Sequence, residues 1–261
     1  MPMRLILLML IALSLPARAA GLSSYYAAEI TSGRLARTAD GYTKACEAGL
    51  TLGGFMETGD PAVRSLHLAI DDCRAALKIK PDHLEASLSY GIGLSFESKR
   101  THKPELARLA KKLFEKLIEE RPNDPLPHAA LAVWNAHVSR AGLFARLALG
   151  GSRRRAHEEF EASFALGAPK KPLMLEYIKF LARGSKQDRA TALETYGRYL
   201  TLPPADGPLN AILDSRAAAL ATALRSGDKK AIKKAVAKAT AFHGIRDWRT
   251  LRALTPEDVA Y

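Results

Sequence analysis

One helical pattern occurs four times along the chain and constrains its fold more than any other feature. In each copy a small residue is followed four positions later by an aromatic residue or Cys, and then by a Pro. The copies are Ala69/Cys73/Pro81, Ala110/Phe114/Pro122, Ala156/Phe160/Pro169 and Ala192/Tyr196/Pro204. A spacing of four places both side chains on one helical face, and the Pro ends the helix because it lacks an N–H. Four copies, at intervals of 41, 46 and 36 residues, indicate a repeat architecture.

The rest of the sequence also has the pattern of helices. Apolar residues recur at intervals of three and four, and β-branched runs are few. The last three copies each follow another helix-like segment, at 83–99, 126–141 and 173–183, and further helices are expected at 25–52, 208–224 and 228–242. The prediction is an all-α chain of helix–turn–helix units, which bury their apolar faces against their neighbours.

The N-terminus has the layout of a secretory signal peptide. Arg4 gives a positive start, an apolar run covers 5–15, and Ala17-Arg18-Ala19 forms a small-residue cleavage motif. This run is shorter than the roughly 20 apolar residues that span a bilayer, although an uncleaved anchor is the alternative. We expect residues 1–19 to be removed and the mature chain to be periplasmic or secreted.

The repeated unit resembles the tetratricopeptide repeat (TPR). The second helix of that repeat carries Ala, an aromatic residue four positions later and a closing Pro, which Ala110, Phe114 and Pro122 match. Tyr90-Gly91 and Leu94 resemble the corresponding stretch of its first helix. The resemblance implies a right-handed α-solenoid of degenerate TPR-like helical hairpins.

The resemblance covers 44–204, with an extension to 242 as the alternative, and is interrupted by insertions at 101–105 and 141–155. Together with the export signal, the longer insertion is similar to TPR components of periplasmic transport systems, such as those beside tripartite ATP-independent transporters. We expect a TPR-like helical repeat domain over 20–243 and a C-terminal tail over 244–261.

The charge of the chain favours an acidic partner. The formal net charge is +12, and an exported basic protein attracts acidic partners, anionic lipid headgroups or anionic polysaccharide, with a merely solvated surface as the alternative. Within 228–242 the Lys residues lie opposite an apolar face, which is typical of a capping helix. Nucleic-acid binding requires interleaved aromatic residues, so we expect no nucleic-acid partner.

The two cysteines, Cys46 and Cys73, fall in neighbouring predicted helices. In an oxidising compartment an isolated pair of this kind often forms a disulfide. The alternative is that Cys73 is a small buried hydrophobic residue in the bulky position of the repeat.

Motifs for catalysis or metal binding are incomplete. His157 opens a run similar to a zinc-protease helix, but the second His is missing. Gly150-Gly151-Ser152 lacks the Lys of a phosphate-binding loop, and favours a helix that starts with Ser152 as N-cap. His128 and His137 are about 13.5 Å apart along one predicted helix, too far to share an ion. We expect no enzyme activity, no cofactor and no metal.

By the resemblance, the first helices of the units line a concave groove that holds a peptide or another extended ligand. Trp, Tyr and Arg usually dominate the energy of an interface. The groove residues carried over by position are Tyr90, Phe96, Trp134, Asn135, Arg140, Tyr177 and Lys179. As an alternative, Trp134 and Tyr177 fill the seams between the units.

The insertion at 141–155 combines an apolar stretch with Arg153, Arg154 and Arg155. One interpretation is a short interfacial helix whose Phe144 contacts a membrane or partner beside an anion-seeking Arg cluster. The alternative is a buried extension of the preceding helix. Arg at a helix start opposes the preference of the helix dipole for acids, which favours an anion site there.

The sequence therefore predicts a non-catalytic periplasmic scaffold that binds another envelope protein, or a peptide segment of one, through its concave face. The alternative is a binding component of a transport system for a small anionic solute or lipid headgroup, which would use Arg153 to Arg155.

Overall fold

The computed structural model describes residues 21–167, 169–205 and 207–261, except for the side chains of residues 143–145. The predicted signal peptide, residues 1–19, lies outside the described residues. Within them the fold is all-α, as predicted, and contains no strand.

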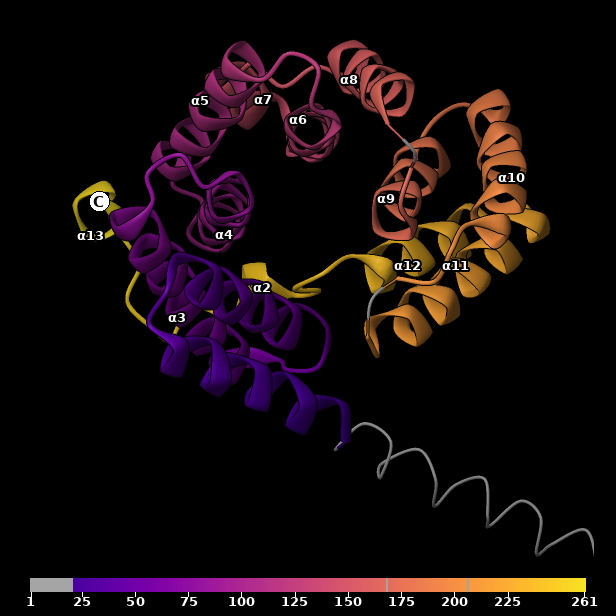
Figure 1. The fold of residues 1–261 in the computed structure, drawn as a ribbon. Coiled ribbons are helices and arrows are strands. Elements are labelled where there is room, and N and C mark those ends of the chain that lie inside the picture. Colours follow the sequence, from indigo (N-terminus) through magenta and orange to yellow (C-terminus); the bar gives the residue numbers. More distant parts are fainter. Residues whose placement is uncertain (1–20, 168, 206) are drawn as a thin grey trace, which may run out of the picture.

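After a helix over 21–36, the main helices pair into hairpins in chain order. The pairs are α2 (Ala39–Phe55) with α3 (Gly59–Ile79), α4 (Leu84–Thr101) with α5 (Pro104–Glu120), α6 (Pro125–Val138) with α8 (Arg153–Leu166), α9 (Lys171–Ala182) with α10 (Lys186–Thr201), and α11 (Leu209–Ser226) with α12 (Lys229–Ala239). A short helix, α7 (Leu143–Leu149), occupies the insertion between α6 and α8. Figure 1 shows the hairpins along an arc, with α4, α6 and α9 on its inner side and α5, α8 and α10 on its outer side.

Local sequence explains where the helices begin. Thr38 caps α2 by accepting a hydrogen bond from the N–H of Gly41 at 3.0 Å. Ser152 caps α8 in the same way, as predicted, with the N–H of Arg155 as donor. Ser185 and Asp188 form a reciprocal capping box at the start of α10.

The small and bulky positions of the repeated pattern lie in the core. Ala69, Ala110, Ala156 and Ala192 are fully buried. Phe114 and Phe160 are 1% and 0% exposed, whereas Tyr196 is half-buried and packs against the neighbouring core. The second helix of each unit therefore turns this face toward its neighbours.

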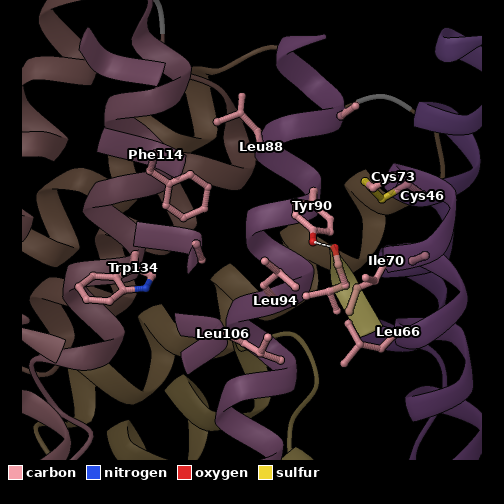
Figure 2. Close-up of a cluster of buried hydrophobic side chains, with 14 of the residues drawn as sticks. Cys46, Leu66, Ile70, Cys73, Leu88, Tyr90, Leu94, Leu106, Phe114 and Trp134 are labelled. Atoms are coloured by element: carbon pink, nitrogen blue, oxygen red, sulfur yellow. Dashed lines mark hydrogen bonds between the residues drawn. A yellow bond between two sulfur atoms is a disulfide. The ribbon is translucent and has the colours of Figure 1, made fainter. Parts of the chain in front are cut away.

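Gly91 shows how closely the two helices of one hairpin approach each other. A Cβ atom at Gly91 on α4 would lie 2.5 Å from Cε1 of Phe114 on α5, well inside van der Waals contact. Figure 2 shows the ring of Phe114 among Tyr90, Leu94 and Trp134 in this core. The absence of a side chain at Gly91 is thus what admits the aromatic ring.

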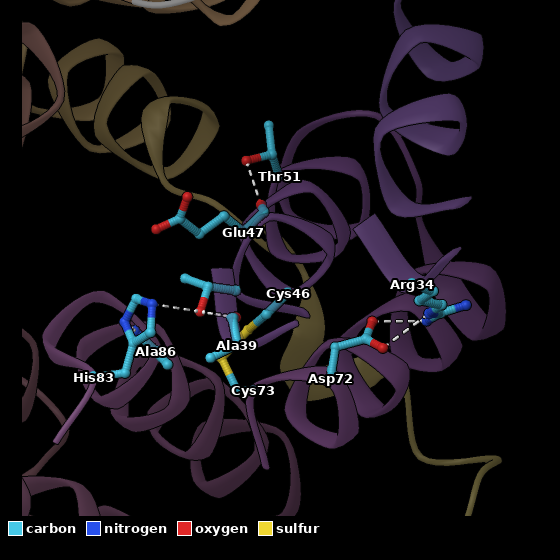
Figure 3. The surroundings of a disulfide bond; sticks show 10 residues. Arg34, Ala39, Cys46, Glu47, Thr51, Asp72, Cys73, His83 and Ala86 are labelled. Atoms are coloured by element: carbon cyan, nitrogen blue, oxygen red, sulfur yellow. Dashed lines mark hydrogen bonds and ion pairs between the residues drawn. A yellow bond between two sulfur atoms is a disulfide. The ribbon is translucent and has the colours of Figure 1, made fainter. Parts of the chain in front are cut away.

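Cys46 on α2 and Cys73 on α3 form a disulfide inside the first hairpin, and both are fully buried (Figure 3). Beside it, the guanidinium of Arg34 donates two hydrogen bonds of 2.8 Å to the carboxylate of Asp72. This pair joins the helix over 21–36 to α3.

The C-terminal residues return to the first two hairpins. We call residues 240–261 the closing segment; it includes η1 (Ile245–Asp247) and α13 (Pro256–Val259). The N–H of Phe242 donates to the carbonyl of Gly54 at 2.7 Å, and the ring of Phe242 lies 4.7 Å from that of Phe96. The C-terminal tail predicted over 244–261 also packs on the first two hairpins: Tyr90 of α4 donates to the carbonyl of Val259, and Arg74 of α3 donates to that of Ala260 at 2.7 Å.

The last hairpin also lies against the beginning of the chain. Leu209 at the start of α11 packs with Tyr26 and Leu52, and the guanidinium of Arg216 lies 4.5 Å from the centre of the Phe55 ring. The array of hairpins thus closes on itself, as the path from α12 back toward α2 in Figure 1 shows.

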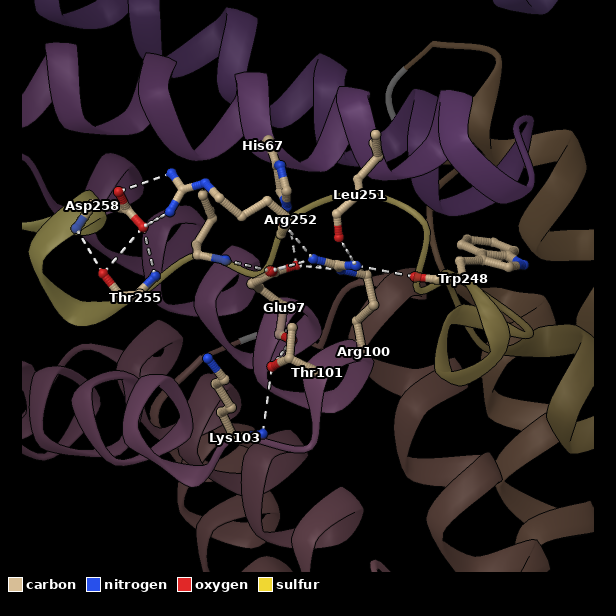
Figure 4. Close-up of polar contacts among 11 residues, drawn as sticks. His67, Glu97, Arg100, Thr101, Lys103, Trp248, Leu251, Arg252, Thr255 and Asp258 are labelled. Atoms are coloured by element: carbon tan, nitrogen blue, oxygen red, sulfur yellow. Dashed lines mark hydrogen bonds and ion pairs between the residues drawn. The ribbon is translucent and has the colours of Figure 1, made fainter.

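Figure 4 shows how α4 holds the closing segment. Arg100 donates hydrogen bonds of 3.1 Å to the carbonyls of Trp248 and Leu251 and one of 3.0 Å to that of Arg252. Glu97 accepts a hydrogen bond of 3.0 Å from the N–H of Leu254. Two buried side chains on one helical turn thereby satisfy the backbone of a segment about 150 residues away.

Candidate ligand-binding site

Most of the residues predicted to line a groove lie in the core. Tyr90 and Tyr177 are 5% exposed, Trp134 is 4% exposed, and Asn135 and Lys179 are fully buried. These five side chains are not accessible to a partner, which corrects the prediction. The alternative interpretation of Trp134 and Tyr177, that they fill seams between units, agrees with their burial.

Their polar atoms are satisfied within the chain. The indole N–H of Trp134 donates to the carbonyl of Ala107 at 3.1 Å, and the side-chain oxygen of Asn135 accepts from the N–H of Ser152 at 3.1 Å. The hydroxyl of Tyr90 donates to the carbonyl of Val259 in the closing segment. Buried polar groups must find such partners, so these positions stabilise the array.

Two of the predicted groove residues remain outside the core. Phe96 is half-buried beneath Phe242 of the closing segment. Arg140 is exposed at the end of α6, where its guanidinium donates to the carbonyl of Arg183 at 3.1 Å.

The Arg cluster at the start of α8 is largely paired with acids. Arg154 lies 2.8 Å from Glu158, and Arg155 lies 3.5 Å from Glu115 on α5 and 3.4 Å from Glu159. These contacts correct the idea of three free guanidinium groups that seek an anion. The side chain of Phe144, the predicted membrane contact, lies outside the described residues.

Arg153 has a different environment from its two neighbours. Its guanidinium lies 4.3 Å from the centre of the Phe180 ring and 3.1 Å from the carboxylate of Asp188. It also borders a cavity of about 370 Å³ between the end of α6 and the start of α8. The residues around this cavity are Ser139, Arg140, Arg146, Gly151, Ser152 and Arg153.

A charged cluster that the sequence did not indicate lies where the last turns of α4, α6 and α9 meet η1. We call it the inner charged cluster. It consists of Lys99, His137, Glu176, Lys179, Arg183 and Arg246. Cations in the last turn of a helix interact favourably with the helix dipole, which helps these positions to accept them.

Glu176 is the carboxylate at the centre of this cluster. It accepts a hydrogen bond from Lys179, and its other oxygen lies 3.7 Å from Nε2 of His137. Burial alone would raise the pKa of Glu176, but the charge and the hydrogen bond of Lys179, with His137 close by, hold that pKa well below its usual range. Burial lowers the pKa of His137 to about 4 despite the carboxylate, so this imidazole is neutral at pH 7.

The remaining cations repel one another. Burial, together with the positive charges of Arg246, Lys179 and Arg183, lowers the pKa of Lys99 to about 8. Four cations thus share one region with the carboxylate of Glu176 and a neutral His137. Lys179 is buried, whereas Lys99 and Arg183 are partly exposed and Arg246 is exposed. Such a surplus of positive charge favours the binding of an anion, because the anion relieves the repulsion.

The described chain has no helix that is long and apolar enough to cross a membrane. Among the same residues, no group of three or more His, Cys, Asp and Glu side chains is arranged to hold a metal ion. The chain has no match among family models, curated protein sequences or solved structures.

Proposed function

We propose that this protein is an exported, non-catalytic scaffold of the cell envelope, built as a right-handed TPR-like α-solenoid, that binds an acidic segment of another envelope protein. The inner side of the hairpin array is the binding face. The observation that carries this proposal is the surplus of cations in the inner charged cluster.

The repeat architecture of the proposal is supported by the order of the hairpins and by their packing. Each marked Ala is fully buried, and Phe114 packs directly on Gly91 of the preceding helix. Successive hairpins contact one another through α3 and α4, α5 and α6, and α10 and α11. Such arrays of stacked units commonly present an extended binding surface.

The acidic character of the ligand follows from the charges that remain accessible. The predicted aromatic residues are buried, so the inner face offers mainly Lys99, Arg183 and Arg246, with Arg140 nearby. These groups come from α4, α6, α9 and η1, so a ligand with several carboxylates along an extended chain can pair with more of them than a single small anion can. Complementary charge of this kind governs specificity and the rate of association.

A small anionic solute or lipid headgroup is a second candidate ligand. The specific observation in its favour is the cavity of about 370 Å³ that Arg140, Arg146 and Arg153 border. Three guanidinium groups from separate segments suit a compact oxyanion.

Photo-crosslinking in cells tests the scaffold proposal. A crosslinking residue is placed beside the inner charged cluster, and captured proteins are identified by mass spectrometry. The charge-reversed variant Lys99→Glu/Arg246→Glu is compared with Lys229→Glu/Lys233→Glu, which makes the same charge change on the exposed face of α12.

The proposal expects the wild type and the α12 variant to capture the same acidic envelope protein, and the inner variant to lose it. Equal capture by all three proteins would show that the inner charged cluster does not select the partner. Capture of no protein, together with a thermal shift by small anions, would favour the second candidate.

A further inference from the structure

A second cavity, of about 410 Å³, lies where the last hairpin meets the first. The end of α2 and the turn after it form one wall, α11 and α12 form the other, and His243 of the closing segment borders it. We call it the closure cavity. Its size falls within the range of about 300–1,000 Å³ that is typical of small-molecule sites.

Arg216 on α11 borders this cavity in a fixed position. Its guanidinium stacks 4.5 Å from the centre of the Phe55 ring, and Nη2 donates to the carbonyl of Phe55 at 3.4 Å. Nη1 is buried, and no residue in the described part of the chain accepts a hydrogen bond from it. Burial alone lowers the pKa of Arg216, with no carboxylate to offset it.

An ordered guanidinium without an acidic partner is unusual, because a buried charge is costly unless it is paired. Glu57 also borders the cavity, but its carboxylate accepts a hydrogen bond of 2.6 Å from the hydroxyl of Ser65. The remaining polar groups at the cavity include the cation Lys238 and the imidazole of His243. Arg216 and Lys238 outweigh the single carboxylate of Glu57, so the net charge around the cavity is positive and suits an anion.

The rest of the cavity is largely apolar. Phe55, Ala219, Ala235 and Ala239 line it with rings and methyl groups. A ligand that fills it therefore needs an apolar body as well as an anionic end. A carboxylate group presents two oxygens to a guanidinium in the geometry that Arg recognises best.

We propose that the closure cavity binds an organic acid whose carboxylate pairs with Arg216 and whose short hydrocarbon chain lies against Phe55 and the alanines of α11 and α12. Because the cavity is formed by the first and last hairpins together, this ligand stabilises the closed array. None of the residues that line the closure cavity belongs to the inner charged cluster, although the charge of Arg216 also acts on Lys179. The inference does not depend on the function proposed above.

Isothermal titration of octanoate into the purified protein tests this site. Octanol, which lacks the carboxylate, and acetate, which lacks the chain, are the matched probes. We expect octanoate to bind, and each probe to bind at least about tenfold more weakly, because a charge-assisted hydrogen bond or several buried methylene groups are lost.

Single substitutions test where the carboxylate of octanoate binds. Arg216→Gln weakens octanoate binding about tenfold or more, whereas Arg225→Gln leaves it unchanged, since Arg225 is exposed at the other end of α11 and lies over Tyr196. Ala219→Trp, at an exposed position, fills the cavity and removes binding while the helix content is retained. If Arg216→Gln does not fold, octanoate binding to Ala219→Trp tests the site instead.

Octanoate that fails to bind the wild type, or that binds Arg216→Gln or Ala219→Trp as tightly as the wild type, overturns the assignment. The assignment is also overturned if octanol binds as tightly as octanoate, because the carboxylate would then contribute nothing to binding. Lys99→Gln, in the inner charged cluster, is expected to bind octanoate normally, which separates this test from that of the scaffold function.

Discussion

The carboxylate of Glu97 accepts two hydrogen bonds of 2.7 Å from the guanidinium of Arg100, one turn further along α4, and this buried pair holds the closing segment in place. Both side chains also bind the backbone of 248–254, and Glu97 lies 3.1 Å from His67 as well. Removal of either partner leaves a buried charge and several backbone groups unpaired, which is strongly destabilising. This ion pair therefore contributes to the closure of the hairpin array, beside the contacts of Phe242 with Gly54 and of Arg216 with Phe55.

This pair makes the stability of the protein depend on pH. Burial raises the pKa of Glu97, but the hydrogen bonds from Arg100 and from the N–H of Leu254, with His67 3.1 Å away, outweigh it and lower the pKa from 4.5 to about 2. Below pH 4.5 Glu97 becomes protonated in the unfolded chain but stays ionised in the folded chain. The free energy of unfolding therefore decreases as the pH falls toward 2. Urea midpoints measured across this interval should fall steeply for the wild type. Glu97→Gln should be less stable at pH 7, and its urea midpoint should change less with pH. If the midpoints of both proteins fall equally with pH, Glu97 is not the cause of the pH dependence.

His137 should remain neutral in mildly acidic solution. Burial lowers its pKa from 6.5 to about 4, so between these values the unfolded chain gains a proton that the folded chain does not, and stability decreases as the pH falls. NMR titration of the imidazole should show its inflection near pH 4. An inflection near pH 6.5 instead would mean that His137 is open to water.

Gly91→Ala should destabilise the second hairpin by about 1–3 kcal/mol, because the new methyl group meets the ring of Phe114. Gly197→Ala is the matched control: apart from the adjoining backbone of α10 itself, nothing lies within 4 Å of the corresponding Cβ position. There the same change should stabilise the protein by about 0.5–1 kcal/mol through helix propensity. Chemical denaturation measures the change in the free energy of unfolding for both variants. Phe114→Leu should offset part of the Gly91→Ala loss, and strict additivity of the two changes would argue against the contact.

Reduction of the disulfide between Cys46 and Cys73 should lower the free energy of unfolding by about 3–4 kcal/mol, as expected from the loop that it closes. Urea unfolding with and without a reducing agent measures the change. The variant Cys46→Ala/Cys73→Ala should resemble the reduced wild type and should not respond to the reducing agent. A midpoint that is insensitive to reduction would show that helix packing alone holds the first hairpin.

Local patterns were sufficient to find the hairpins. The pairing of Ala110 with Phe114 depends on a spacing of four within one helix, which the sequence displays directly. The helix predicted at 25–52 was wrong: two helices occupy this region, one over 21–36 and α2 (Ala39–Phe55), because Arg37 has a positive φ of 52° and Thr38 caps α2. The other boundaries followed to within a few residues: the segment predicted at 228–242 corresponds to α12 (Lys229–Ala239). Its end moved because Phe242 leaves the helix to pack on Gly54.

The candidate site could not be predicted in the same way, because it depends on contacts between distant parts of the chain. Tyr90 was expected in a groove, but Val259 of the closing segment covers its hydroxyl. Lys99 and Arg246 approach each other because the chain returns after α12, and no local pattern indicates that return. Lys179 was also expected in the groove, but the packing of α9 against its neighbours buries it, and residue spacing alone does not show which helical face is buried.

The most direct test of the central claim, that the inner charged cluster binds acidic segments, is the fluorescence anisotropy of a labelled oligoglutamate peptide titrated with the purified protein. The wild type and Lys229→Gln/Lys233→Gln should bind the peptide equally, with an affinity that decreases as salt is added. Lys99→Gln/Arg246→Gln should bind it about tenfold more weakly. If this inner variant binds as tightly as the α12 variant, the peptide is attracted by the overall charge of the protein, and the inner charged cluster is not the binding site.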